Sequence, residues 1–502
     1  SWNLGLLPLG YSRVEEELMI QIGNKPYIRL DCVFEALIPS QVEKRLREKL
    51  IQFYSNKILN DVSSHDKIEF DILISCWDFD CGNRIGELRN AGFKSKDLKD
   101  FENILIDLTR KCISGYESHL SRLNKDITKL IATTNMVSKS MQKTDDIWNL
   151  AKMFNTLIEE ITLHGTPQFS SVARMAFMSK AICDSLITIK YFKEADINLF
   201  YNSIRTVASE FRQDFILFKN DKLSKNLFLD KYGHLRSGTF NIMAPTYRDI
   251  SFGSFELEDS PYSTNEINNN VLTQESISNY IKDCPFQDIS AKQLFNFLRS
   301  SIEKRELFKF QFSKPLSLSL EILTKIGNLA GFSREQISYL DVNLVEMLTF
   351  SHSKEDFLKF IDMNTSYNQK LYEDNSNLVL PPFIKGEMDI KIVNLGDSRP
   401  NFVTKKVVRS PIYYLTNHNT NVDLNNKIVM IDNADPGYDW IFTYNICGLI
   451  TKYGGVASHM AIRSAEFNIP AAIGCGVHIF DKILAWKNIE LDCASNRILP
   501  FV

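Results

Sequence analysis

A glycine turn followed by a serine and a histidine is the part of this sequence best suited to covalent chemistry. The apolar run at residues 448–451 has the character of a strand, and Gly454 and Gly455 then allow a tight turn with positive φ. Ser458 is a favourable N-cap for a helix that begins at His459. The sequence therefore predicts a strand, a glycine turn and a helix whose first residue is a histidine.

The first turn of a helix suits a phosphorylated histidine for electrostatic reasons. Its amide groups lack acceptors within the helix, and the positive end of the helix dipole lies there, so an anion is stabilised. The neutral imidazole is also a good nucleophile near pH 7. A histidine without any chemical role fits the same local pattern, and the spacing alone does not distinguish the two interpretations.

The same segment resembles the swivelling phosphohistidine domain of the phosphoenolpyruvate-utilising enzymes. The family pattern is roughly G-x-x-T-x-x-G-G-x-x-S-H-x-A-I-x-x-x-E-x-x-I-P-A-x-x-G. The residues in register with it are Gly448, Thr451, Gly454, Gly455, Ser458, His459, Ala461, Ile462, Glu466, Ile469, Pro470, Ala471 and Gly474. The resemblance implies that His459 is the catalytic phosphocarrier and that Gly454, Gly455 and Ser458 form its loop.

Two departures from the family pattern concern regulation and charge. Ala457 stands where many relatives have a threonine, so phosphorylation of that neighbour is not available here. Ala465 replaces an arginine that often precedes the glutamate, and Arg463 is the candidate substitute, although two positions along a helix direct it to another face.

The order of the helical region and the histidine domain along the chain narrows the choice of acceptor molecule. The chain ends about 40 residues after His459, and a pyruvate-binding (β/α)₈ barrel needs about 250 residues, so pyruvate is not expected. A helical region followed by the histidine domain is similar to the arrangement of rifampin phosphotransferases. Segments such as HDKIEFD, GTPQFSSVARMAF, YGHLRSGTF and PNFVT resemble the branch that includes the L-glutamine kinases of Campylobacter-type capsule phosphoramidate synthesis. That resemblance implies the side-chain amide of L-glutamine as acceptor.

A glutamine site needs an acidic group for the ammonium, an arginine for the carboxylate and a general base. The candidates for substrate binding are His65, Lys67, Glu69, Arg174, His234 and Arg236. The first three alternate along an expected strand, which would put them on one face. A solvated strand face, a buried ion pair of Arg174 and a purely loop-ordering His234 are open alternatives. Tyr438, Asp439 and Trp440 are candidates for domain-surface contacts, and core packing of Trp440 is equally compatible.

Helices and strands must hold these candidate residues in place. The pattern of apolar residues along the chain predicts a multidomain α+β protein. Residues 1–83 are expected to form an α+β segment, with β-leaning pieces around a helix at residues 41–59. Residues 84–379 should form a mainly helical acceptor-binding domain, including helices at 147–161 and 173–189 and a long ordered loop at 231–256. Residues 380–502, with short strands alternating with helices, should form the compact α/β swivelling domain.

ATP and Mg²⁺ are the cofactors that the family resemblance implies. We find neither a GxxxxGK[ST] loop nor an N-terminal region long enough for an ATP-grasp fold, so the ATP-binding domain is expected upstream of this chain. The carboxylate ligands of Mg²⁺ are expected there too, and none is assigned here. Swivelling requires flexible connections, expected at residues 362–377 and 397–401. The abrupt apolar start without Met is typical of a fragment.

Composition excludes several other classes of protein. The 502 residues carry a net charge of −3, which offers no basic excess for nucleic acid. Nine cysteines without a CxxC pair indicate reduced thiols in a cytoplasmic protein, and we expect no signal peptide and no membrane span.

Two further functions stay open at this point. One is a related phosphotransferase with another acceptor, such as pyruvate, an antibiotic or a sugar alcohol. The other is a non-enzymatic phosphocarrier.

Overall fold

The computed structural model describes residues 18–23, 25–60, 68–236, 240–249, 272–286, 288–348, 353–375, 380, 383–384, 400–415, 422–434, 436–455 and 458–501. The chain divides into two compact units that alternate along the sequence. Unit 1 comprises Ser1–Thr133, Glu159–Glu210 and Ser263–Phe312, and unit 2 comprises Thr134–Ile158, Phe211–Tyr262 and Ser313–Val502. They interleave because long helices contribute residues to both, and the boundaries near 83 and 380 stay predictions.

Unit 1 begins with an antiparallel hairpin, β1 (Met19–Ile22) and β2 (Lys25–Ile28), followed by α1 (Leu30–Leu37) and α2 (Lys44–Asn60). The helix expected at residues 41–59 is therefore confirmed. The further elements are α3 (Cys81–Asn90), α4 (Ser95–Ser114), α7 (Thr166–Thr188), α8 (Glu194–Asn202), α11 (Gln274–Tyr280) and η7 (Ile281–Asp283). All nine cysteines of the chain are free thiols, as the absence of CxxC spacing indicated.

The strand expected around Glu69 is wrong. Ile68–Ile72 form η4, a short π-helix, in which the amide of Leu73 donates to the carbonyl of Ile68 at 3.1 Å. Ile68, Ile72 and Leu73 are buried, so the apolar residues face the core with a helical rather than an alternating spacing. The alternation argument for a shared face thus fails for Glu69, while His65 and Lys67 lie outside the described residues.

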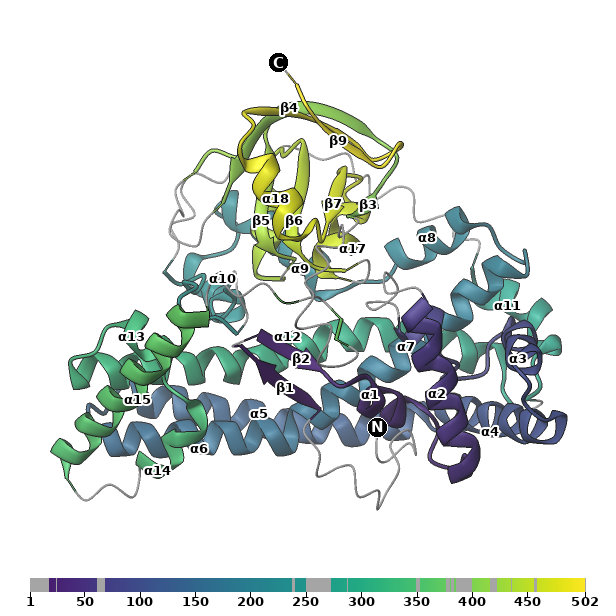
Figure 1. Cartoon of the computed structure of the whole chain (residues 1–502), viewed down its shortest axis with the longest axis horizontal. Coiled ribbons are helices and arrows are strands. Elements are labelled where there is room, and N and C mark those ends of the chain that lie inside the picture. Colours follow the sequence, from purple (N-terminus) through teal and green to yellow (C-terminus); the bar gives the residue numbers. More distant parts are fainter. Residues whose placement is uncertain are drawn as a thin grey trace. The chain divides into compact units, whose positions relative to one another are not determined.

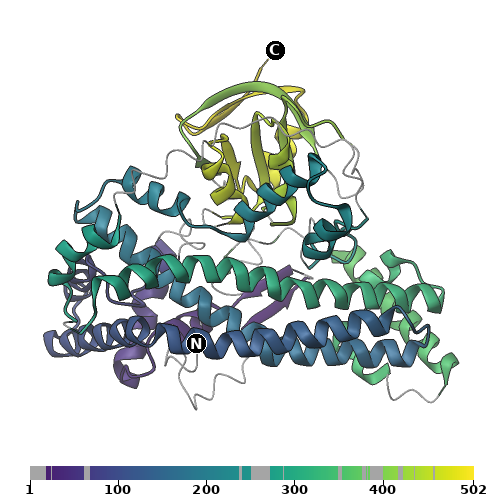
Figure 2. The same ribbon diagram turned by 180° about the vertical axis from the view of Figure 1, so that it is seen from behind.

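Long helices dominate the middle of the chain, as predicted. α5 (Tyr116–Met141), α6 (Ile147–His164) and α12 (Ala291–Ala330) each contain residues of both units. The helices expected at 147–161 and 173–189 correspond to α6 and α7. α12 continues through Pro315, and Ser319 Oγ donates to the carbonyl of Pro315 at 3.0 Å. Two opposite views show α12 as one uninterrupted helix (Figure 1, Figure 2).

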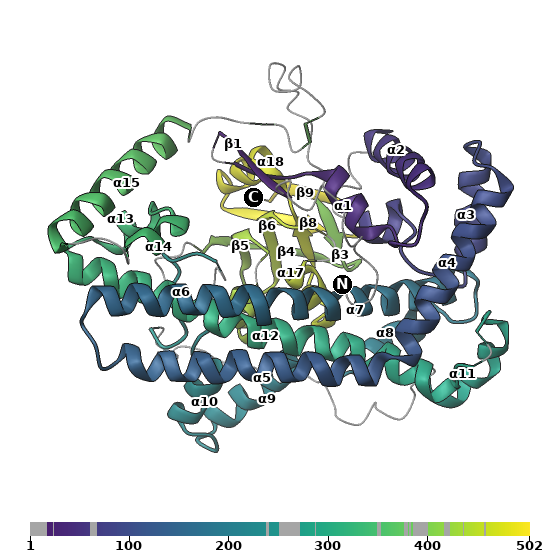
Figure 3. The same ribbon diagram turned by 90° about the horizontal axis from the view of Figure 1, so that it is seen from below.

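The helical part of unit 2 also contains α9 (Val207–Lys219), which starts in unit 1, α10 (Lys225–Tyr232), α13 (Arg334–Ser338), η8 (Val342–Leu344), α14 (Val345–Leu348) and α15 (Lys354–Asn375). α13 and α15 lie side by side (Figure 3). The flexible connection expected at 362–377 is wrong as far as residue 375, because α15 continues that far. Phe357 and Ile361 hold it to a buried apolar cluster, and Thr365, one turn further along, is buried as well. The second expected connection lies largely outside the described residues.

The C-terminal part of unit 2 is built on a seven-stranded mixed sheet. Its strands are β3 (Asn401–Val403), β4 (Val407–Tyr414), β5 (Ile428–Asn433), β6 (Gly448–Tyr453), β7 (Ala471–Ile473), β8 (Asn488–Asp492) and β9 (Arg497–Pro500), in the order β3-β7-β6-β5-β4-β8-β9. β4, β5, β6 and β7 are parallel neighbours, and β3, β8 and β9 pair antiparallel. The expected short strands alternating with helices, and the α/β character, are confirmed.

Both faces of the central strands are buried, which fixes their register. On one face, Met430 and Ile450 are paired and pack with Phe480 of α18 (Gly476–Leu484), which lies across the sheet (Figure 1). On the other face, Val429 and Ile431 are also fully buried. Continuous burial of this kind is typical of parallel strands covered on both sides. Among the described residues, no helix is long and apolar enough to cross a membrane.

Candidate phosphohistidine site

The strand, glycine turn and helix predicted around His459 are present. β6 ends at Tyr453, Gly454 follows with φ of +137°, and α17 (His459–Glu466) begins at the histidine. Ser458 is the N-cap of α17, with φ −66° and ψ 153°, and its Oγ accepts a hydrogen bond from the amide of Ala461 at 3.4 Å. The side chain of His459 lies outside the described part of the structure. Its backbone position at the helix start is as predicted.

Backbone packing beneath the loop holds the turn in place. A Cβ on Gly474, which has φ of +72°, would stand 2.2 Å from the carbonyl oxygen of Gly454. The amide of Gly474 donates to Thr451 Oγ1 at 2.9 Å, and the amide of Cys475 donates to the carbonyl of Thr451 at 2.9 Å. Thr451 is fully buried. These contacts tie the end of β6 to the segment after β7, so the start of α17 has a rigid base.

Arg463, the candidate substitute for the missing family arginine, is buried on α17 and packs against Phe467. Its guanidinium carbon lies 4.5 Å from the centroid of the Phe467 ring, a cation–π contact one helical turn further along. Ser464 beside it is fully buried as well. Arg463 therefore stabilises the C-terminal end of α17, and its effect on a phosphorylated His459 stays a prediction.

The comparison with known families decides the nature of this segment. Residues 424–496 match the family of the PEP-utilising enzyme mobile domain. The match begins before β5 and ends after β8, so it includes the whole loop before α17. None of the curated proteins compared with the chain matches it. The match therefore identifies residues 424–496 as similar to the mobile domain of PEP-utilising enzymes.

Within the mobile domain, Tyr438 and Trp440 belong to η9 (Pro436–Thr443) and are both buried. The Trp440 ring lies 6.0 Å from that of Tyr444, in an edge-to-face arrangement. The structure therefore favours core packing for Trp440 over a contact at the domain surface. The side chain of Asp439 lies outside the described residues.

Among the predicted acceptor residues, the structure brings Glu69 and Arg174 together in unit 1. Arg174 lies on α7, which contacts η4, the element that carries Glu69. Burial lowers the pKa of the Arg174 guanidinium from its usual value of 12.5 to about 10, and the negative charge of Glu69 acts in the opposite direction. The two do not form a direct salt bridge, and in the described part of the chain Arg174 makes no hydrogen bond.

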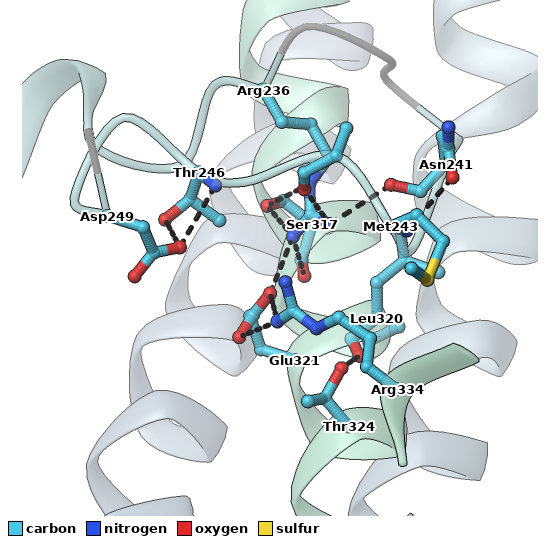
Figure 4. Close-up of polar contacts among 12 residues, drawn as sticks. Arg236, Asn241, Met243, Thr246, Asp249, Ser317, Leu320, Glu321, Thr324 and Arg334 are labelled. Carbon is cyan, nitrogen blue, oxygen red and sulfur yellow. Dashed lines mark hydrogen bonds and ion pairs between the residues drawn. The ribbon is translucent and has the colours of Figure 1, made fainter. Parts of the chain in front are cut away.

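Arg236 is bound entirely within the protein (Figure 4). Its guanidinium donates to Ser317 Oγ at 3.0 Å, to Glu321 Oε1 at 2.9 Å and to the carbonyls of Asn241 and Ala244, each at 3.3 Å. Glu321 also accepts from Arg334 at 2.8 Å. The Arg236 side chain is only 1% exposed, and each of its three nitrogens donates to a protein acceptor.

The network around Arg236 orders the loop that follows α10. Arg236 and Thr246 form a β-bridge, and Thr246 donates through its hydroxyl to Asp249 at 2.7 Å. The loop is therefore anchored to α12, on which Ser317 and Glu321 lie (Figure 4). Half-buried His234 precedes Arg236 in the same loop. These contacts favour a structural role for Arg236, and binding of substrate by His234 stays a prediction.

Phe177 and Arg305 are two residues of unit 1 that the sequence did not single out as candidates. Phe177 lies one turn after Arg174 on α7, and the guanidinium carbon of Arg305 on α12 lies 5.7 Å from its ring centroid. The available signal was the charged run at residues 303–306 inside an otherwise apolar helix. The four charged side chains at residues 303–306 are half-buried, whereas the side chains of a charged run are normally solvated.

A magnesium site is not evident in the described residues, where no three His, Cys, Asp or Glu side chains form a group that could hold a metal ion. No step below is derived through a metal, and the predicted Mg²⁺ and ATP requirements stay predictions.

Proposed function

We propose that the protein is a phosphotransferase that carries a phosphoryl group on His459 and passes it to a small acceptor, for which L-glutamine is the best candidate. The observation that supports this most is the mobile-domain match together with the Ser458-capped helix that starts at His459. The overall reaction would be ATP + L-glutamine + H₂O to AMP + phosphate + L-glutamine phosphate. ATP would be bound by a domain outside this chain.

The local chemistry of the loop is compatible with a phosphohistidine. A phosphoryl group at the first residue of α17 would meet first-turn amides and the positive end of the helix dipole. In the transfer step, the bond between phosphorus and the imidazole nitrogen breaks while a bond from the glutamine amide nitrogen to phosphorus forms. The electron pair returns to the imidazole, and the amide nitrogen releases one proton to a base.

Glu69 and Arg174 support an amino acid as the acceptor. The two charges attract each other without a direct salt bridge, so a zwitterion can be held with its ammonium at Glu69 and its carboxylate at Arg174. A site for an apolar antibiotic would instead be lined mainly by apolar and aromatic side chains. Paired charges therefore favour a polar acceptor. We propose a cytoplasmic location, in keeping with the nine free thiols.

The test is phosphorus NMR of the full chain with L-glutamine and either ATP with Mg²⁺ or phosphoramidate, a small donor that phosphorylates histidine chemically. The second donor removes any dependence on an ATP-binding domain. The matched control for His459→Ala is His478→Ala, because His478 is an exposed histidine on α18 of the same domain. We expect a phosphohistidine signal and then the signal of the product, L-glutamine phosphate. Both signals should be lost in His459→Ala and kept in His478→Ala.

Each outcome of this experiment has a definite meaning. A phosphohistidine that depends on His459 but yields no product with glutamine would reject glutamine and keep the relay. AMP and phosphate formed from ATP would support the dikinase reaction. Absence of any signal that depends on His459, with either donor, would overturn the phosphohistidine proposal. A phosphohistidine that no acceptor discharges would favour a phosphocarrier without enzymatic activity.

A further inference from the structure

Arg305 is a cation whose surroundings do not satisfy its donors. Its side chain is 26% exposed, and its salt bridge is to the adjacent residue Glu306, at 3.3 Å. The Nε atom of Arg305 is buried and has no hydrogen-bond partner. A buried donor without an acceptor is costly, and more so when it is charged. Such a group in a native protein calls for an explanation, and binding of an anion would supply one.

Arg174, which is also in unit 1, likewise has guanidinium donors without acceptors among the described residues. It is half-buried, its pKa is lowered by burial, and it forms no hydrogen bond or salt bridge with the residues that the structure describes. Phe177 is three residues from Arg174 on α7, and its ring contacts the guanidinium of Arg305. Residues three apart on a helix share a face, so Arg174 projects from the face of α7 whose Phe177 contacts Arg305.

An anion that contacts a partly buried guanidinium compensates for the hydration which that group has lost. Arginine presents its donors in a planar fork that matches a carboxylate. Glu69 offers the opposite charge beside Arg174, and Phe177 offers an apolar surface for an aliphatic chain. The set therefore has one acidic side chain, two basic side chains and an apolar surface, which is the composition that a small amino acid requires.

We propose that Arg305 is a second anion-binding arm of the acceptor site and that Arg174 and Arg305, the arginine pair, together bind the α-carboxylate of the acceptor. This inference rests on the proposed function for the identity of the acceptor, but the arginine pair was not needed to reach that function. The ammonium group binds at Glu69 and the aliphatic chain packs against Phe177. Arg305 is thereby a substrate-binding residue that determines specificity for a free carboxylate.

The test is calorimetric titration of the full chain with three probes: L-glutamine, L-glutaminamide, which lacks the free carboxylate, and inorganic phosphate. We expect Arg305→Gln to weaken L-glutamine binding tenfold to a hundredfold and to leave the weak binding of L-glutaminamide unchanged. Damage to the fold would weaken both ligands equally, so the ratio of the two affinities isolates the carboxylate contact. Arg174→Gln should reduce the same ratio.

Arg299→Gln is the matched control, since Arg299 is an exposed arginine on α12 that donates to the carbonyl of Ser203 at 3.5 Å. It should leave all affinities unchanged. Equal binding of L-glutamine by wild type and Arg305→Gln would overturn this inference and leave the proposed function intact. Phosphate binding that depends on Arg305, without glutamine binding, would overturn the carboxylate assignment and the glutamine proposal. Failure of all three probes to bind would overturn the anion site.

Discussion

Gly474 and Gly454 are packed backbone against backbone under the histidine loop, so closely that a Cβ on Gly474 would stand 2.2 Å from the carbonyl oxygen of Gly454. Both residues have positive φ, +72° and +137°. The contact joins the turn after β6 to the turn after β7. The position of α17 therefore depends on two residues that carry no side chain at all.

Gly474→Ala should destabilise the mobile domain by about 2–4 kcal/mol, because the new Cβ meets backbone and the residue must keep a positive φ. Thermal unfolding of the full chain measures the effect. Gly86→Ala is the control, since nothing lies within 4 Å of the added Cβ in α3 and alanine favours a helix. Equal effects of the two substitutions would contradict the close approach.

Ser458→Ala should slow phosphorylation of His459 by phosphoramidate and lower stability by about 1 kcal/mol, because the cap that orders the first turn of α17 is lost. Phosphorus NMR gives the rate. Ser333→Ala removes the comparable cap of α13, where Ser333 Oγ accepts from the amide of Gln336 at 3.1 Å. That variant should lose similar stability and keep the rate. A rate unchanged in Ser458→Ala would refute a role for the cap.

Arg236→Gln should lower the free energy of unfolding by about 3 kcal/mol, since it removes a buried cation from its hydrogen bonds to Ser317, Glu321 and loop carbonyls. Arg334→Gln should cost less, because Arg334 is 27% exposed and Glu321 keeps Arg236 as a partner. Chemical denaturation measures both. The reverse order of the two losses would show that Arg236 is not the anchor of the loop.

Asp78 should make the protein less stable as the pH rises from 4 to 6. Burial raises the pKa of Asp78 from 3.8 to about 6, although the positive charge of Arg84 opposes this and Asp80 adds a smaller repulsion. The folded state therefore favours the protonated carboxyl, whose contribution is complete below pH 3.8 and lost by about pH 6. The stability of Asp78→Asn relative to wild type should rise by about 3 kcal/mol over this range. A difference independent of pH would contradict the shift.

His119 should make the protein more stable as the pH rises, which is the opposite of the effect of Asp78. Burial, and then the charge of Arg122, lowers the pKa of His119 from 6.5 to about 4, and its Nε2 is 2.8 Å from Ser171 Oγ. The folded state favours the neutral ring, so its contribution is complete above pH 6.5 and lost as the pH falls towards 4. Between these values, wild type should lose about 3 kcal/mol more than His119→Gln. Denaturation midpoints at several pH values measure this, and parallel losses in both proteins would disprove it.

The sequence by itself determined the histidine loop and the helical character of the middle of the chain. Both depend on local properties: the freedom of Gly454 at positive φ, the capping hydroxyl of Ser458, and apolar residues at helical spacing in α6 and α7. Neighbouring residues carry all the information that these features need. For this reason the start of α17 was predicted to the residue.

Only the tertiary structure decided which distant side chains meet. Glu69 and Arg174 are far apart in sequence, and Glu69 lies in a π-helix where alternation predicted a strand, because burial of Ile68 and Ile72 outweighed the local pattern. Arg236 lies in a polar loop, as ligand-binding arginines often do, yet it donates hydrogen bonds to acceptors on α12. Long-range packing and burial determine whether a charge is satisfied, and that cannot be read from residue order.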